Sequence, residues 1–273
     1  MSVPIQSVLV TLKRYRENFS KLWISAENQQ KKNNGFTSMK ILCVIPGRAG
    51  SKGVRHKNTR MINGEPLIAF AIKAAKRSTY IDRLIVSSED DEILSIAKDL
   101  KIDIPFKRPK ELAADTSPLI SVVQHAYNFF KEQKQYFDAV VCLQPTCPFV
   151  KTETIDSAVD LWQRTGCDSV TTVSEITKGH PYISKRMENN HMIKNFCIIP
   201  ENAVVSPRQK REKAYYLTGS LYLRDKRLLQ NIETKGHCLG VDSKAVVVDE
   251  FEAVDINTEF DLKFAEYIMS SRA

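Results

Sequence analysis

From Met39 onward, short apolar runs alternate along the chain with longer segments in which apolar residues recur every three or four positions. The short runs are typical of buried strands, and the longer segments are typical of amphipathic helices. This succession predicts an α/β fold with a mainly parallel sheet, right-handed crossovers and helices on both faces. We expect strands at 40–45, 83–87, 138–143, 169–173, 220–223 and 245–248, and helices at 67–77, 92–100, 119–133, 153–165 and 258–269.

Local signals support several of these boundaries. Gly166 follows the predicted helix at 153–165 and is a helix-stop signal. Thr258 with Asp261 three residues later is a capping pattern at the start of the last helix. Residues 174–213 are rich in His, Asn, Lys and Pro and break the strand–helix rhythm, so we expect them to form an excursion from the sheet.

The first 38 residues differ from the rest of the chain. Their apolar residues have loosely helical spacing, and a polar tract follows that ends at Gly35. The apolar core and cleavage site of a secretory signal are not recognisable there. Two interpretations remain open, a disordered extension or a true start at Met39. Either way, we expect residues 39–273 to carry the chemistry and residues 1–38 to be dispensable for it.

The charge balance restricts the partners. The chain has 273 residues, with 40 Lys and Arg against 32 Asp and Glu, and a formal net charge of +8. Half of this excess lies in residues 1–38, where six Lys or Arg stand against two Glu. The remainder is spread along the chain, which favours small anionic ligands over nucleic acid. No run of about 18 apolar residues occurs, so no membrane-spanning segment is expected.

The six cysteines indicate a reducing compartment. They never form a C-x-x-C pair, and several lie inside apolar runs. This pattern favours buried, reduced thiols over disulfides or a zinc site, and therefore a cytoplasmic protein. The cysteines are Cys43, Cys142, Cys147, Cys167, Cys197 and Cys238.

A glycine-rich basic loop follows the first predicted strand, at residues 46–53, and continues to Lys57 and Asn58. Its three glycines allow a ligand to approach the backbone, and Arg48, Lys52 and Lys57 provide cations suited to a polyphosphate. The glycine spacing matches neither the G-x-x-x-x-G-K-[ST] nor the G-x-G-x-x-G motif. A basic surface loop without a ligand is the alternative interpretation.

Two further clusters lie where ligands are expected. Arg108 precedes the segment 115–118, which leads into the helix predicted at 119–133. This segment is either a helix N-terminus that binds a ligand or only a helix cap with proline near the first helical position. Gln144 follows the predicted strand at 138–143, at the carboxyl end where α/β sheets bind ligands. A stiff turn with two prolines is the alternative for this second cluster.

A fourth cluster suits a metal ion. Asp255 and Asn257 alternate along an extended segment, which places their oxygen atoms on one side. Such a pair suits Mg²⁺, which retains water molecules and bridges substrate phosphates. Ordinary polar residues at the end of a strand are the alternative.

Taken together and in this order, the motifs resemble those of the acylneuraminate cytidylyltransferases, from Met39 to the last helix. The resemblance implies a Rossmann-like nucleotidyltransferase fold with an arm inserted at 174–213, through which the subunits form a homodimer. It also implies transfer of CMP from CTP to a 2-keto-3-deoxy sugar acid. The motifs that carry it are Ile45 to Gly53 with Lys57-Asn58, Arg108-Pro109, Glu111 to Ala113 with Asp115-Thr116, Gln144 to Pro148, Pro207 to Gln209, Gly219 to Tyr222 and Asp255 to Thr258.

The resemblance also implies roles for individual residues. Arg48, Lys57 and Asp255 are expected to be catalytic, and Asp255 and Asn257 to hold Mg²⁺. The nucleotide is expected to contact Arg48, Ser51, Lys52, Lys57, Asn58, Arg108 and Ser117. The acidic sugar is expected to contact Gln144, Arg208, Gln209 and Thr218.

Two departures from the family pattern bear on these expectations. Residues 216–219 read Tyr-Leu-Thr-Gly where sialic acid synthetases usually carry Arg-Pro-Asn-Gly, which leaves the acceptor open. Asn257 replaces a second aspartate, which is expected to weaken metal affinity. Two other functions therefore remain: a nucleotidyltransferase for another base or sugar, and an inactive homologue that binds a nucleotide or sugar.

Overall fold

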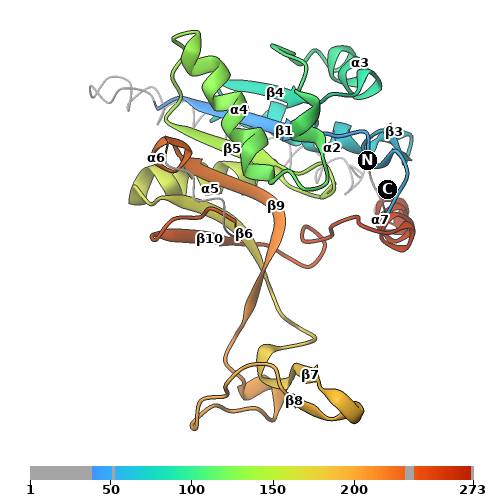
Figure 1. Ribbon diagram of the computed structural model, residues 1–273, viewed down its shortest axis with the longest axis vertical. Coiled ribbons are helices and arrows are strands. Elements are labelled where there is room, and N and C mark those ends of the chain that lie inside the picture. Colours follow the sequence, from blue (N-terminus) through green and yellow to red (C-terminus); the bar gives the residue numbers. More distant parts are fainter. Residues whose placement is uncertain (1–38, 51–52, 231–236, 272–273) are drawn as a thin grey trace, which may run out of the picture. The chain divides into compact units, whose positions relative to one another are not determined.

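The structure, a computed structural model, describes residues 39–50, 53–230 and 237–271 (Figure 1). The chain divides into a unit at Met1–Met39 and a second unit at Lys40–Ala273. The N-terminal extension, residues 1–38, lies outside the described residues.

A six-stranded sheet in the order β10-β6-β9-β5-β1-β4 forms the centre of the second unit. Five of its strands are parallel to one another, and β9 runs antiparallel to β5 and β6, on either side of it. The predicted mainly parallel sheet is therefore confirmed. The strands are β1 Ile41–Pro46, β4 Arg83–Ser87, β5 Ala139–Leu143, β6 Ser169–Glu175, β9 Tyr215–Asp225 and β10 Ser243–Val247.

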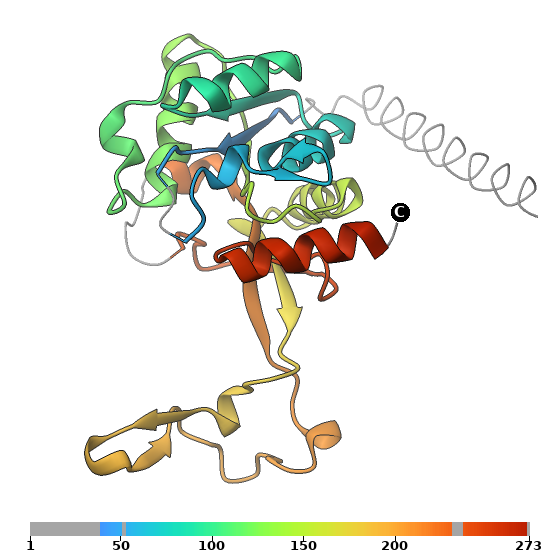
Figure 2. The ribbon, with the colours of Figure 1, turned by 90° about the vertical axis from the view of Figure 1, so that its right-hand side faces the viewer.

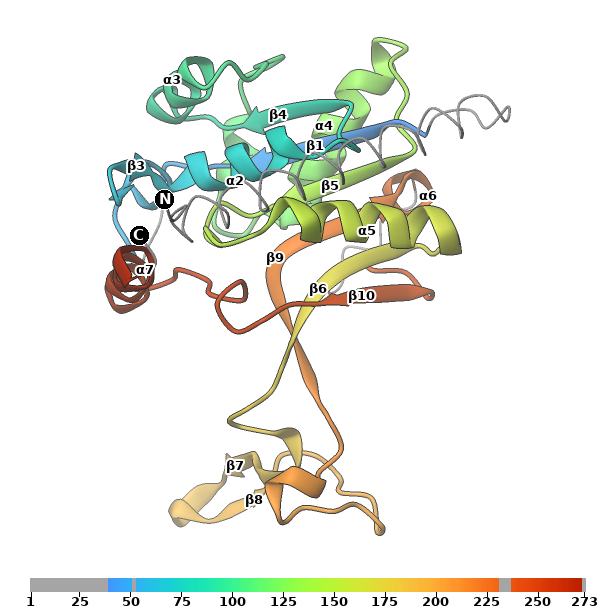
Figure 3. The ribbon, with the colours of Figure 1, turned by 180° about the vertical axis from the view of Figure 1, so that it is seen from behind.

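Helices cover both faces of the sheet, as expected (Figures 1 and 3). Within β1, Ile41, Cys43 and Ile45 enter one buried cluster while Leu42 and Val44 enter another, so the strand is apolar throughout. One cluster includes α2 Leu67–Arg77, α3 Asp91–Asp99 and α5 Thr152–Thr165, and the other includes α4 Leu119–Glu132 and the short α6 Lys226–Gln230. A third cluster lies under α7 Glu259–Ser271 and β2 Met61–Ile62, which pairs with β3 Glu65–Pro66.

The expected helix ends are confirmed. Gly166 closes α5 in the left-handed conformation, with φ 65°. At the start of α7, Asp261 accepts a hydrogen bond from the Thr258 amide at 2.7 Å, and the Asp261 amide donates to Thr258 Oγ1 at 3.2 Å. This reciprocal pair holds the chain just before the helix, where Asn257 lies.

Strand β9 differs most from expectation, because it spans 11 residues where four were predicted. Its first residues are polar and aromatic, and they pair with the end of β6 without being covered by helices on both faces. An apolar run was therefore a poor guide to its length. The register with β6 shifts between Thr171 and Val173, opposite Gly219, whose φ is +80°.

The predicted excursion is confirmed as an arm, residues 176–214, that connects β6 to β9. It extends away from the sheet on these two strands and carries a small hairpin of β7 Lys185–Met187 and β8 Ile193–Asn195 (Figure 2). Three short 3₁₀ segments complete it, at Pro181–Ile183, Asn189–His191 and Arg208–Lys210.

None of the helices in the described residues has the length and apolar character needed to cross a membrane.

Candidate functional site

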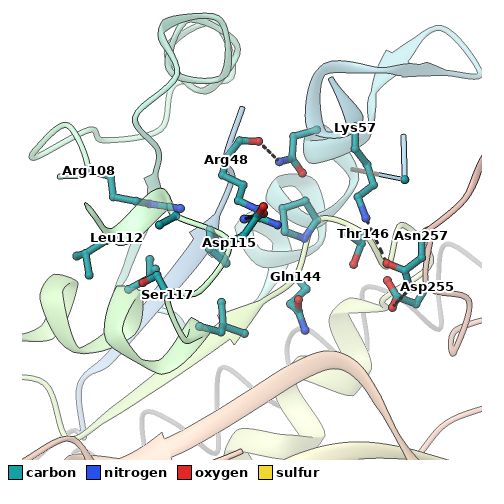
Figure 4. Close-up of a pocket in the computed structure, with 17 residues that line it drawn as sticks. Arg48, Lys57, Arg108, Leu112, Asp115, Ser117, Gln144, Thr146, Asp255 and Asn257 are labelled. Carbon is teal, nitrogen blue, oxygen red and sulfur yellow. Dashed lines mark hydrogen bonds and ion pairs between the residues drawn. The ribbon is translucent and has the colours of Figure 1, made fainter. Parts of the chain in front are cut away.

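A cavity of about 410 Å³ opens at the carboxyl ends of the parallel strands. Such a volume lies within the range of about 300–1,000 Å³ that is usual for small-molecule sites. Figure 4 shows Arg108 and Leu112 at one end of it, Lys57, Asp255 and Asn257 at the other, and Arg48 between them. The cavity brings together eight residues singled out in the sequence, namely Arg48, Lys57, Asn58, Arg108, Ser117, Gln144, Asp255 and Asn257.

Arg48 bridges two walls of the cavity. Its Nη1 donates to Asp115 Oδ1 at 2.7 Å, which joins the loop after β1 to the segment before α4. Both side chains are partly exposed, at 37% and 46%. An ion pair this exposed contributes little to stability, so an anionic ligand can compete with Asp115 for the guanidinium. Sequence reasoning identified Asp115 as part of a helix start but missed this pairing.

Lys57 lies in a short 3₁₀ segment, Lys57–Thr59, and its ammonium points to the chain before α7. Its Nζ donates to the Ile256 carbonyl at 2.7 Å and to Asn257 Oδ1 at 3.3 Å. Burial lowers the pKa of Lys57, and the nearby Asp255 charge opposes this shift. A partly buried ammonium with two neutral acceptors is suited to gain an anionic ligand.

Arg108 forms the opposite end of the cavity and is 4% exposed. Its Nε donates to Ser87 Oγ at 3.1 Å, its Nη2 donates to the Ser87 carbonyl, and its Nη1 lies 3.8 Å from Glu89 Oε2. Burial lowers its pKa to about 10, so the guanidinium remains charged at neutral pH. All three guanidinium nitrogens thus engage protein atoms, and Arg108 contributes to the cavity as a charged wall.

Leu112, Leu119 and Val122 add apolar surface to the cavity, with Leu112 at the same end as Arg108 (Figure 4), and none of the three was assigned a role from the sequence. They belong to the segment that leads into α4 and to its first turns. Their spacing looks like that of ordinary core residues, so the sequence offered no distinguishing signal. Together with Arg108 they form a wall suited to a flat, partly polar ring.

Asp255 and Asn257 lie on the same side of an extended segment, which confirms the expected juxtaposition. Asn257 Nδ2 donates to Asp255 Oδ2 at 2.7 Å, while the Ile256 amide between them donates to the Thr146 carbonyl at 2.9 Å. Cys147 Sγ lies 3.9 Å from Asp255 Oδ1, and burial raises the pKa of this thiol, which therefore acts as a neutral donor. The arrangement anchors Asp255 at the rim of the cavity.

The oxygen atoms at this rim fit a metal ion only in part. Within residues 39–50, 53–230 and 237–271, no three His, Cys, Asp or Glu side chains are close enough together to hold a metal ion. Asp255 supplies one carboxylate and Asn257 one amide oxygen. Such a set suits a hard cation that obtains its remaining ligands from water and substrate phosphates.

Gln144 lies where β5 ends, and its Nε2 donates to the Gly219 carbonyl at 2.7 Å. This bond uses the side-chain nitrogen of Gln144, so the side-chain oxygen is the atom that remains to contact a ligand. Thr218, predicted to contact the sugar, is buried and its hydroxyl lies 2.6 Å from Thr172 Oγ1 and 3.1 Å from Ser220 Oγ. The structure therefore places Thr218 within the sheet, outside the set of residues that lines the cavity.

Two other predicted residues, Arg208 and Gln209, are described but lie away from the cavity. Both side chains are exposed in the arm, and neither lines the cavity. Ser51 and Lys52 lie outside the described residues. The glycine-rich basic loop is thus described on either side of these two positions, at 46–50 and from Gly53 onward.

Comparisons with known proteins give a consistent result. The family model described as Cytidylyltransferase matches residues 42–228. A CMP-N,N'-diacetyllegionaminic acid synthase of Legionella pneumophila is 34% identical over 232 residues, which are 85% of this chain and 97% of that protein. A pseudaminic acid cytidylyltransferase of Campylobacter jejuni is 30% identical over 232 residues, 84% of this chain and 96% of that protein.

The fold is likewise shared with a solved structure. A CMP:2-keto-3-deoxy-manno-octonic acid synthetase complexed with CTP superposes with a TM-score of 0.65 at 15% sequence identity, covering 86% of this chain and all of that one. At this identity the likeness concerns the fold alone.

We expect Gly53→Ala to weaken binding of CTP. A Cβ at Gly53 would lie 1.9 Å from the Asn257 carbonyl oxygen, so the loop and the chain before α7 must move apart. Titration calorimetry should show a loss of about tenfold or more in affinity, equivalent to roughly 1.4 kcal/mol. The matched control is Gly50→Ala in the same loop, where a Cβ meets no protein atom within 4 Å, so the loop need not move and the loss of affinity should be much smaller. Equal affinities in the two variants would contradict this contact.

Proposed function

The chain belongs to the cytidylyltransferase family, and from this premise we propose that it transfers CMP from CTP to the anomeric hydroxyl of a nonulosonic acid. The hydroxyl oxygen forms a bond to the α-phosphorus, and its proton passes to water. The bond between the α-phosphorus and the bridging oxygen breaks, and pyrophosphate leaves. The observation that carries the proposal is the cavity that combines the cationic side chains Arg48, Lys57 and Arg108 with two carboxylates, Asp115 and Asp255, at the carboxyl edge of the sheet.

Arg48 and Lys57 are the residues we assign to the triphosphate. The transition state of such a transfer spreads negative charge over phosphate oxygens, and cations placed in advance stabilise it. In the described structure both side chains contact groups that a phosphate can replace, Asp115 for Arg48 and neutral oxygens for Lys57. The wall of Arg108, Leu112 and Val122 is then left for the base and its sugar.

We assign Mg²⁺ to Asp255 and, through its side-chain oxygen, to Asn257. When bound, the ion would neutralise charge on the phosphates that leave as pyrophosphate. The present orientation of Asn257 directs Nδ2 to Asp255 and Oδ1 to Lys57. Asn257 would therefore have to rotate to offer its oxygen to a metal, whereas Asp255 already lies at the rim.

The acidic sugar is expected next to Gln144, whose amide is held by the Gly219 carbonyl. A nonulosonic acid also carries a carboxylate, which calls for a cation such as the planar guanidinium of Arg208. Because Arg208 and Gln209 lie in the arm and not at the cavity, we propose that they reach the cavity of a second copy of the chain.

Exposed apolar side chains of the arm support a homodimer. A monomer in water rarely exposes so many large apolar groups on one segment, so the arm is suited to an interface. Met187, Ile193, Phe196 and Ile198 are 72%, 61%, 69% and 94% exposed.

A cytoplasmic location is part of the proposal. All six cysteines are free, and five of them are buried. Free thiols are typical of proteins in a reducing compartment.

The proposed function is tested by a substrate panel. Purified protein is incubated with Mg²⁺, each of the four nucleoside triphosphates and a set of nonulosonic acids, and pyrophosphate release is measured. We expect turnover with CTP and at least one acid, and a loss of about 10²- to 10³-fold in Lys57→Ala, the usual effect of removing a charge-stabilising donor. Absence of turnover with every pair would favour an inactive binding protein, and a preference for another base would contradict the nucleotide assignment.

The metal assignment predicts opposite effects of two substitutions. Asp255→Ala should abolish turnover at ordinary Mg²⁺ concentrations, because the one charged ligand is lost. Asn257→Asp should lower the Mg²⁺ concentration for half-maximal rate, because it adds a second carboxylate. Calorimetric titration of Mg²⁺ into protein saturated with CTP provides a readout independent of turnover. Unchanged rates in Asp255→Ala, or full activity in EDTA, would show that the metal binds elsewhere.

The dimer proposal predicts complementation between two inactive chains. If each cavity uses its own Lys57 and the Arg208 of the other copy, a mixed dimer of Lys57→Ala and Arg208→Ala chains contains one intact site. Mixing the two inactive variants, under conditions that allow subunits to exchange, should therefore restore turnover. Mixed dimers that form but stay inactive would place Arg208 outside the partner's site.

A further inference from the structure

The peptide group that joins Arg48 to Ala49 is held at both of its polar ends. Its carbonyl oxygen accepts a hydrogen bond from Asn58 Nδ2 at 2.9 Å, and its amide donates to Glu89 Oε1 at 2.8 Å. The two atoms belong to one rigid plane, so two bonds on opposite edges fix the orientation of that plane. The direction in which the Arg48 side chain leaves the backbone is thereby restricted.

Glu89 is placed for this role by the end of β4. It follows Ser87 and Ser88, its side chain is 14% exposed, and its Oε2 is buried without a hydrogen-bond partner. A carboxylate so shielded needs a compensating charge, and Arg108 Nη1 lies 3.8 Å away. The Glu89 carboxylate therefore lies between a guanidinium on one wall of the cavity and a backbone amide on the other.

Ser87 and Ser88, which precede Glu89, also link Arg108 to the loop after β1. The Ser87 carbonyl accepts hydrogen bonds from the Gly47 amide at 3.0 Å and from the Arg108 guanidinium, and the Ser88 carbonyl accepts from the Arg108 amide at 2.8 Å. Residues 87–89 thus hold both Arg108 and the start of the glycine-rich basic loop.

We propose that Glu89 is a positioning residue for the transfer reaction, which acts by holding the Arg48–Ala49 peptide so that Arg48 faces the triphosphate. Asn58 shares this task from the other side, because its buried amide donates to the Arg48 carbonyl. Glu89 does not line the cavity, so it acts through Arg48 and not on the substrate. The proposal rests on the proposed function, since it takes Arg48 to contact the phosphates.

The first test concerns the hydrogen bond itself and does not depend on turnover. Amide exchange at Ala49, followed by NMR, should be slow in the wild type and much faster in Glu89→Ala. In Glu89→Gln the side-chain carbonyl can still accept from the amide, so protection should largely return. Glu92→Ala changes an exposed acid on α3 and should leave exchange unchanged. Equal exchange at Ala49 in the wild type and Glu89→Ala overturns the proposal whatever the enzyme's substrates are.

The second test separates positioning from a merely structural role. Glu89→Ala should lower kcat/KM for CTP by about 10²-fold, as small misplacements of a catalytic group do, with the KM for the acidic sugar unchanged. Glu89→Gln should restore most of the loss. Because Glu89 acts through Arg48, the double variant Arg48→Ala, Glu89→Ala should be no slower than Arg48→Ala alone.

Effects that multiply in the double variant would overturn the proposal, as would wild-type kinetics in Glu89→Ala. Should the wild-type chain show no turnover with any substrate pair, the proposed function fails. CTP titrations of the wild type, Glu89→Ala, Arg48→Ala and the double variant then still report whether Glu89 acts through Arg48. Comparable CTP affinities in Arg48→Ala and the double variant support the proposal in that case, and a further multiplied loss contradicts it.

Discussion

Three cationic side chains of the described residues share one cavity, and groups of the chain itself must compensate their charges before any anion is bound. Like charges repel, and burial together with the charge of Arg48 lowers the pKa of both Lys57 and Arg108. Each cation is therefore compensated within the chain. Arg48 pairs with Asp115, Arg108 lies against Glu89 and the Ser87 carbonyl, and Lys57 donates to the Ile256 carbonyl and Asn257.

The groups that pair with the three cations differ in how easily a substrate can replace them. This difference separates the role of Arg108 from the roles of Arg48 and Lys57. The partners of Arg108 are buried with it, so Arg108 stays in place and shapes the wall. Asp115 is 46% exposed, and the partners of Lys57 are a backbone carbonyl and a neutral amide, so phosphate oxygens can replace them. Among the described residues of this cavity, Arg48 and Lys57 are consequently the two cations available to a triphosphate, whereas Glu89 and Ser87 hold the loop that carries Arg48.

The antiparallel strand β9 shapes the other side of the site. It lies between β5 and β6, and because it runs opposite to both, its first residues meet the carboxyl ends of its neighbours. Gly219 thus reaches Gln144, and the arm leaves the sheet at the same edge. A parallel strand in this place would begin at the opposite edge, so the chain after β6 would have to cross the sheet instead of returning beside the cavity. The strand direction therefore couples the acceptor side of the site to the segment proposed to join two subunits.

The sequence by itself determined the order and nearly all bounds of the sheet's helices and strands, because apolar periodicity, Gly166 and the Thr258–Asp261 cap act over a few residues. It also determined which residues are candidates, and eight of them meet at one cavity because parallel strands end at a common edge. It did not determine the direction and length of β9, the burial of Thr218, the distance of Arg208 from the cavity, or the contacts of Glu89 with Ala49 and Arg108. Those depend on pairings between segments tens of residues apart, such as Glu89 with Ala49. Only the packed sheet decides which of these segments become neighbours, since no local periodicity encodes a partner so distant in the chain.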